Sequence, residues 1–146
     1  MKNRLATFFL GTETHPRITD AGKLAVRLLF GLTLALRHGW PTTRTALAGG
    51  DPGFPDPLGL GPEVTMLLVG TVEFVFVLFV LFGFLTRLSA LAVVVNFSVA
   101  VFIHHWADPF GHKELAFLYL SAMTTILLLG PGRFSVDNFL FGKKGD

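Results

Sequence analysis

Five side chains that can exchange protons or hold a ligand by hydrogen bonds lie in or beside long apolar segments of this sequence. They are His38, Glu73, Asn96, His104 and Glu114. An ionisable group inside a membrane segment costs on the order of 2.5 to 3.5 kcal/mol, so it faces a bundle interior or pairs with another polar group. We therefore treat these five residues as the candidate ligand-binding and proton-handling set.

Glu73 lies near the middle of the most apolar stretch, residues 62–85, which has no Lys, Arg or Asp between Val64 and Leu85. At about 1.5 Å per residue, a helix of this length crosses a hydrocarbon core of about 30 Å. The sequence thus predicts a membrane helix with a buried carboxyl group. A glutamate that hydrogen-bonds to a neighbouring helix for packing alone is the simpler alternative, because such bonds are common within membranes.

The composition narrows the function classes. Of the 146 residues, 51% are hydrophobic and only 15% are charged, which is too apolar for an ordinary soluble domain. The absence of cysteine excludes disulfides and thiolate-held zinc or iron–sulfur clusters. The net charge is only +2 and the bases are scattered, so no nucleic-acid partner is expected.

Four apolar segments predict an all-α fold, an integral membrane four-helix bundle. We expect an interfacial N-terminal segment at 1–20, a transmembrane domain at 21–130 and a cytoplasmic tail at 131–146. The expected spans are about 21–40, 62–85, 88–106 and 113–129. Pro41 is expected to end the first span, and the Pro- and Gly-rich segment 41–61 to form a loop that caps one end.

Charge predicts the orientation, because four spans place both termini on one side of the membrane. That side would hold Lys2, Arg4, Arg17, Lys23, Arg27, Arg87, Arg133, Lys143 and Lys144, and the other side Arg37, Arg44 and Lys113. The excess of basic residues on the side of the termini predicts that both termini of this multi-pass protein are cytoplasmic. His38, His104 and Glu114 are then expected at the outer end. We expect Arg27 to snorkel towards the lipid headgroups.

Helical depth brings two candidates together. Glu73 and Asn96 each lie roughly 15 Å from the outer ends of their predicted helices, so the two side chains can touch. This geometry predicts an outward-opening polar pocket with Glu73 and Asn96 at its floor. The alternative is that these side chains serve only packing or the interface.

Several strings in the sequence resemble the DoxX family of small four-helix membrane proteins. They are ArgLeuLeuPheGlyLeu from Arg27, His38 with Gly39, ValGluPhe around Glu73, GlyPheLeuThrArgLeu through Arg87, LysGluLeuAlaPheLeuTyrLeu from Lys113, and LeuLeuLeuGlyProGlyArgPheSerValAsp ending at Asp137. The resemblance implies a prokaryotic cytoplasmic membrane protein linked to redox work, since DoxD-type subunits belong to thiosulfate:quinone oxidoreductases. It also marks Arg87, Arg133 and Asp137 as positions of a cytoplasmic-side motif.

We weigh three functions. In the first, the protein is a redox-associated subunit that interacts with quinone, with Glu73 as proton carrier, His104 or His38 as headgroup ligand and Glu114 as proton exit. A quinone is then the candidate cofactor, and a partner redox subunit supplies the electrons. The alternatives are a non-catalytic assembly or partner subunit of a membrane complex, and a small transporter component that requires a homo-oligomer.

The side chains present also raise the questions of a haem site, a metal site and an ion pair in the tail. Haem ligation would need His38 and His104 to face each other, and histidines that lie near the lipid headgroups without a haem are the favoured interpretation. A metal site would need His104, His105, Asp108 and His112 to converge, but their spacing matches no standard site and no metal is expected. Arg133 is expected to pair with Asp137 and hold the tail on the cytoplasmic surface.

Overall fold

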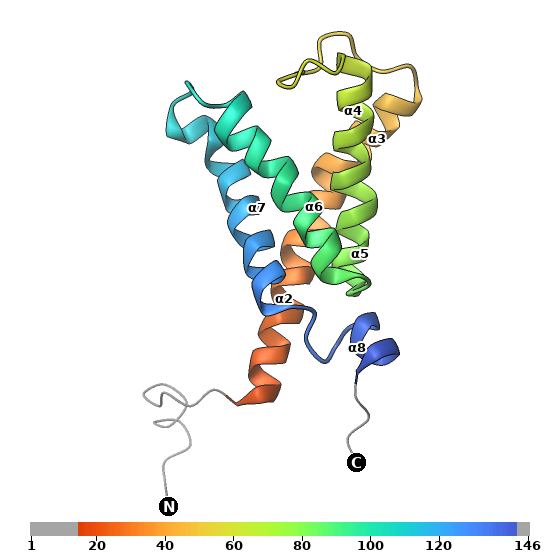
Figure 1. The fold of residues 1–146 in the computed structure, drawn as a ribbon, viewed down its shortest axis with the longest axis vertical. Coiled ribbons are helices and arrows are strands. Elements are labelled where there is room, and N and C mark those ends of the chain that lie inside the picture. Colours follow the sequence, from red (N-terminus) through yellow and green to blue (C-terminus); the bar gives the residue numbers. More distant parts are fainter. Residues whose placement is uncertain (1–14, 143–146) are drawn as a thin grey trace, which may run out of the picture.

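The computed structural model describes residues 15–142, and every regular element in that range is a helix (Figure 1). The elements are α2 (Pro16–Leu34), η1 (Ala35–Gly39), α3 (Trp40–Leu47), α4 (Pro62–Thr71), η2 (Val72–Phe76), α5 (Val77–Phe82), α6 (Thr86–Val99), η3 (Ala100–His104), α7 (Phe110–Leu129) and α8 (Val136–Phe141), where η denotes a π-helical turn. Most of the predicted N-terminal segment, with Lys2 and Arg4, lies outside the described residues, as do Lys143 and Lys144.

The first helix is longer than predicted at both ends. It begins at Pro16 rather than near residue 21, and it continues through η1 and α3 to Leu47. The expectation that Pro41 ends it is wrong. The Trp40 N–H donates to the Ala35 carbonyl, five residues back, so the pairing has changed from α to π before the proline. Pro41 then lies in the first turn of α3, where its missing N–H is tolerated.

The other predicted helices begin and end within a few residues of the expected positions. The helix formed by α4, η2 and α5 ends before Gly83, which has the left-handed φ of 72° that favours glycine. The helix formed by α6 and η3 runs from Thr86 to His104, and α7 starts at Phe110 rather than Lys113. The short helix α8 in the tail was not predicted.

Two helices within the described range are long and apolar enough to cross a membrane. They are Pro62–Phe82, with 21 residues, and Thr86–His104, with 19 residues. Only 33% of the most apolar window of each is buried inside the molecule, so most of the apolar surface of both helices is uncovered. This pattern fits helices whose outer faces meet lipid.

The helices pack closely at one end of the molecule and separate at the other. Leu34, Val77, Val80, Val93 and Met123 are fully buried in the core that joins α2, α5, α6 and α7. Towards the loop 48–61, α3 stays with α4 and α6 stays with α7, and the two pairs diverge (Figure 1). We call this the loop end, and the opposite end, where the described chain begins and finishes, the terminal end.

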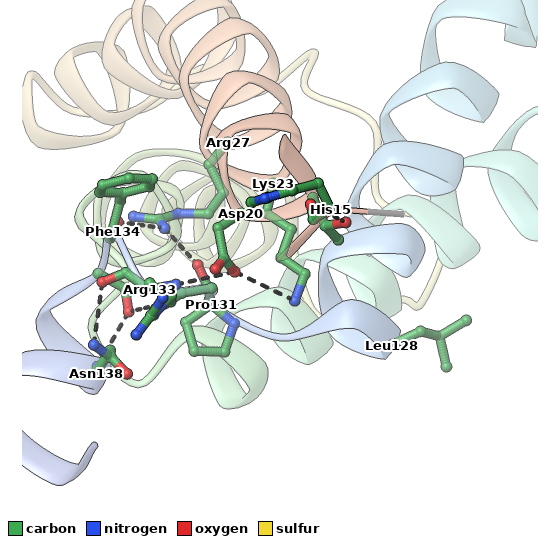
Figure 2. Close-up of polar contacts among 12 residues, drawn as sticks. His15, Asp20, Lys23, Arg27, Leu128, Pro131, Arg133, Phe134 and Asn138 are labelled. Atoms are coloured by element: carbon green, nitrogen blue, oxygen red, sulfur yellow. Dashed lines mark hydrogen bonds and ion pairs between the residues drawn. The ribbon is translucent and has the colours of Figure 1, made fainter. Parts of the chain in front are cut away.

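Arg27 holds the terminal end together, and the expectation that it snorkels is wrong. Its side chain is only 1% exposed. The guanidinium donates to the carbonyls of Val80 and Leu81, each at 2.8 Å, and to those of Pro131 at 2.7 Å and Phe134 at 2.9 Å. Carbonyls at a helix C-terminus lack hydrogen-bond partners within the helix. The buried arginine supplies donors to two such carbonyls of α5. Its bonds to Pro131 and Phe134 also hold the tail against the helices (Figure 2).

The tail also caps the N-terminus of α6. The predicted ion pair between Arg133 and Asp137 is wrong, because the Asp137 carboxylate forms this cap instead. The Asp137 carboxylate accepts hydrogen bonds from the Leu85 N–H at 2.7 Å, the Thr86 N–H at 2.8 Å and the Thr86 hydroxyl at 2.7 Å. Arg133 is exposed, and its backbone N–H donates to Asp20 at 3.2 Å (Figure 2). A carboxylate at a helix N-terminus satisfies free N–H groups and favours the helix dipole.

We expect Arg27→Lys to destabilise the protein by about 2 to 4 kcal/mol, because one ammonium group cannot reach all four carbonyls and some are left unsatisfied. Thermal unfolding in detergent measures the loss. Arg37→Lys, at an exposed position of the same helix, is the control. Equal midpoints for the two variants would contradict the role given to Arg27.

Candidate functional site

Glu73 and Asn96 are in direct contact, as helical depth predicted. The Asn96 Nδ2 donates to the Glu73 Oε1 at 3.0 Å, and Glu73 is only 8% exposed. Glu73 lies in η2 and Asn96 in α6, so the bond joins the two membrane-capable helices. Among the described residues, the second carboxyl oxygen of Glu73 has no hydrogen-bond partner, which leaves it available to a ligand.

A pocket of about 460 Å³ extends from this pair towards the loop end. It lies between α4 and α6, which separate above the level where α6 contacts η2 (Figure 1). Its walls are mainly aliphatic, and its lining comprises Phe54, Pro55, Pro57, Leu58, Leu60, Thr65, Leu68, Val69, Val72, Glu73, Ala92, Val95, Asn96, Val99, Ala100, His104 and His105. The arrangement suits a largely apolar molecule with one hydrogen-bonding group.

The loop between α3 and α4 lies over the loop end of this pocket. Phe54, Pro55 and Pro57 turn onto the pocket. Asp56 holds the loop, because its carboxylate accepts from the Leu60 N–H at 3.0 Å, the Gly61 N–H at 2.7 Å and the Thr65 hydroxyl at 2.6 Å. The bond from Thr65, together with those from the backbone, lowers the pKa of Asp56. The composition of residues 41–61 predicted a capping loop, but no pattern in the sequence marked Asp56 as the residue that holds it.

Three of the candidate residues lie in π turns: His38 in η1, Glu73 in η2 and His104 in η3. Such turns are rare and occur often at functional sites, because they change the direction of side chains within a helix. The first two turns pack against each other, and a Cβ added to Gly39 would overlap the Glu73 carbonyl oxygen. Glycine at position 39 is therefore what lets the first helix approach the Glu73 backbone.

His38 lies outside the pocket and packs instead on Tyr119, with the ring centroids 5.7 Å apart. Tyr119 is 3% exposed and also contacts Phe30 and Phe97. Sequence reasoning did not select Tyr119. The feature of the sequence that could have marked Tyr119 is that it is the single tyrosine of the chain and lies inside an apolar segment.

His104 lines the pocket at the loop end, but the neighbouring histidines do not converge with it as a metal site. His105 Nδ1 lies 2.7 Å from the Asp108 carboxylate, and this contact lowers the pKa of Asp108. Within residues 15–142, no three His, Cys, Asp or Glu side chains are placed to share a metal ion. The ring of His104 packs on His105 and that of His38 packs on Tyr119, so the two imidazoles that haem ligation would need do not face each other.

Glu114 and the cytoplasmic-side motif lie away from the pocket. Glu114 is exposed on α7 and contributes nothing to the pocket lining. Arg87 is exposed at the terminal end, where its guanidinium reaches the Leu128 carbonyl at 3.4 Å. Together with Arg133 and Asp137, it therefore belongs to the packing of the tail rather than to the Glu73 site.

The fold and the site define a helical membrane protein with a buried polar pair between apolar helices. The chain belongs to the DoxX family, whose model matches residues 22–106, more than half of the chain. The match contains His38, Glu73, Asn96 and His104 but ends before α7 and the tail. Comparison with curated proteins finds no match, and comparison with solved structures finds none either.

We expect Gly39→Ala to destabilise the protein by about 1 to 3 kcal/mol, because the added methyl group pushes η1 away from the Glu73 backbone. Gly22→Ala is the matched control in the same helix, since a Cβ there meets nothing within 4 Å. Replacing a helical glycine by alanine at an open site is neutral or stabilising. Thermal unfolding of both variants measures the contrast, and an unchanged midpoint for Gly39→Ala would refute the close approach.

We expect Asp56→Asn to loosen the loop at neutral pH. Because the folded protein lowers the pKa of Asp56, the loop contacts are complete above the ordinary pKa of an aspartate and are lost as the pH falls through the lowered value. Hydrogen exchange at the Leu60 and Gly61 amides measures this. Asp51→Asn, in the same loop, is the control, and equal exchange in both variants would contradict the role of Asp56.

Proposed function

We propose that this DoxX-family protein is a four-helix bundle of a prokaryotic cytoplasmic membrane, with residues 21–130 as the transmembrane domain and both termini in the cytoplasm. The family match and the two membrane-capable helices support the membrane location. The orientation rests on the basic excess at the terminal end, where Lys23, Arg27, Arg87 and Arg133 lie. The loop end then faces the outside.

Within this frame, we propose a redox-associated subunit that binds the headgroup of a quinone. The observation that carries the proposal is the Glu73–Asn96 pair, buried at the floor of a mainly aliphatic pocket between the two most apolar helices. A carboxyl group in such surroundings is costly unless it has a use or a partner. Asn96 occupies only one of its oxygens, and the other remains free for a ligand.

A quinone accepts two electrons and two protons. The chain has no cysteine and no cluster of metal ligands in its described part, so we assign the supply of electrons to a partner redox subunit. Glu73 exchanges a proton with the ligand at its free oxygen, and Asn96 fixes the orientation of the carboxyl group. His104, at the loop end of the pocket, exchanges protons with the outside, and the exposed Glu114 is the proposed exit beyond it.

His38 receives a supporting role in this proposal. It packs against Tyr119 rather than lining the pocket, and its neighbour Gly39 lies against the Glu73 backbone. We therefore propose that His38 and Tyr119 position η2 from behind, instead of contacting the headgroup. The headgroup ligand is then His104, the other histidine considered for that task.

The test is the identification, by extraction and mass spectrometry, of small molecules retained by gently purified protein. We expect the wild type to retain a quinone and Glu73→Gln to lose it, because the amide no longer presents the free carboxyl oxygen that is proposed to bind the headgroup. Glu63→Gln, at an exposed position on the same helix, should retain it. If neither the wild type nor Glu73→Gln retains a ligand while both fold normally, Glu73 is structural and a non-catalytic partner subunit is the better account.

A further inference from the structure

The polar side chains of the tail are engaged with the chain itself. The Asp137 carboxylate caps α6, and the Asn138 side chain donates to the Arg133 carbonyl at 3.2 Å. The Ser135 hydroxyl accepts from the Asn138 N–H at 3.1 Å. These are the three polar side chains between Ser135 and Phe141, so the segment has none left over for water.

The apolar side chains of the same segment are uncovered. Phe139, Leu140 and Phe141 are 86%, 53% and 73% exposed, and Val136 is 37% exposed. A helix turns about 100° per residue, which places Val136, Phe139 and Leu140 on one face of α8. We call these three residues the tail face. Three consecutive exposed apolar residues are a liability on a surface that meets water, so the tail face requires a cover.

Hydrogen bonds to the turn between the two membrane-capable helices set the level of α8. The Asp137 N–H donates to the Gly83 carbonyl at 2.8 Å, and its carboxylate accepts from the Leu85 N–H at 2.7 Å. The two helices have 21 and 19 residues, so each is about 30 Å long, which matches a hydrocarbon core. The turn therefore lies where hydrocarbon meets headgroups, and α8 begins beside it (Figure 1).

From these features we infer that α8 is a membrane anchor, whose tail face is seated in the lipid leaflet at the terminal end, between acyl chains and headgroups. The surface on both sides of the turn supports lipid as the cover. Phe82 before the turn and Leu88 after it are 61% and 60% exposed on the membrane-capable helices. Since α8 is bonded to the turn between them, it lies at the edge of a surface that meets lipid.

The charges near α8 suit the same partner. Arg133 is exposed before the helix, and the sequence places Lys143 and Lys144 after it. Interfacial segments combine an apolar face with bases that attract anionic lipid headgroups. The partner is thus a leaflet that contains anionic phospholipid. This inference depends on the membrane location of the protein and not on its binding a quinone.

The test measures what surrounds the tail face in the full chain. The chain has no cysteine, so Phe139→Cys or Leu140→Cys carries a single nitroxide label. In nanodiscs of phosphatidylcholine and phosphatidylglycerol, electron paramagnetic resonance measures collisions of the label with oxygen, which concentrates in lipid, and with a water-soluble nickel chelate. Leu88→Cys on α6 is the lipid reference, and Asp51→Cys, exposed in the loop 48–61, is the water reference.

We expect both tail labels to resemble the label at Leu88, with nickel collisions about threefold or more below those at Asp51, because the chelate stays out of the apolar part of the leaflet. Nickel collisions equal to those at Asp51 would show that the tail face meets water and would overturn the inference. Few collisions with either reagent would reveal a protein cover, such as a second copy or residues 1–14, and would overturn it equally. Thermal unfolding checks each labelled variant, and Phe141→Cys replaces one that does not fold.

Discussion

The cost of a carboxyl group in apolar surroundings is the constraint on which the rest of this structure depends. Glu73 lies in the most apolar helix of the chain and is nearly buried, so the protein must supply polar partners for it. Asn96 supplies one by crossing from the neighbouring membrane-capable helix. The π turn at residues 72–76 and the close approach of Gly39 then fix the backbone that carries the carboxyl group.

The two ends of the molecule serve this site differently. At the terminal end, Arg27 and Asp137 tie α2, α5, α6 and the tail through hydrogen bonds to backbone groups. This end is therefore a fixed base. At the loop end, the helix pairs diverge (Figure 1). The pocket lies at this end, with α4 and α6 among the helices that line it. The hydrogen bonds at the terminal end hold the helices together there, whereas the helix pairs separate at the loop end and the Glu73–Asn96 contact is kept between them.

Sequence reasoning predicted the features that depend on hydropathy and helical depth. The boundaries of the later helices follow from the Gly and Pro residues between them. The contact of Glu73 with Asn96 follows because the two helices are antiparallel and an α-helix rises about 1.5 Å per residue, which places both side chains at the same depth. The covering loop follows from its composition. The resemblance to the DoxX family, carried by short strings, is confirmed by the family match.

The errors concern side chains whose partners are backbone groups far away in the sequence. Arg27 bonds to carbonyls 53 to 107 residues away, and Asp137 to N–H groups 51 and 52 residues away, so no local pattern reveals either. Pro41 was misjudged because the π turn before it accommodates the missing donor. Tyr119 was missed because its packing against His38 leaves no repeating pattern in the sequence. Asp56 was missed for the same reason, since its hydrogen bonds form within a loop and at the start of the next helix.

The most direct test of the central claim is infrared difference spectroscopy of the protein in lipid, with and without decyl-benzoquinone. We predict that ligand binding shifts a stretching band of the Glu73 side chain, which is recognised because the shift is absent in Glu73→Gln. We also expect Asn96→Ala to alter the same band before ligand is added. Binding of the ligand with no change in any band that Glu73→Gln removes would show that the carboxyl group does not meet the headgroup, which would contradict the account.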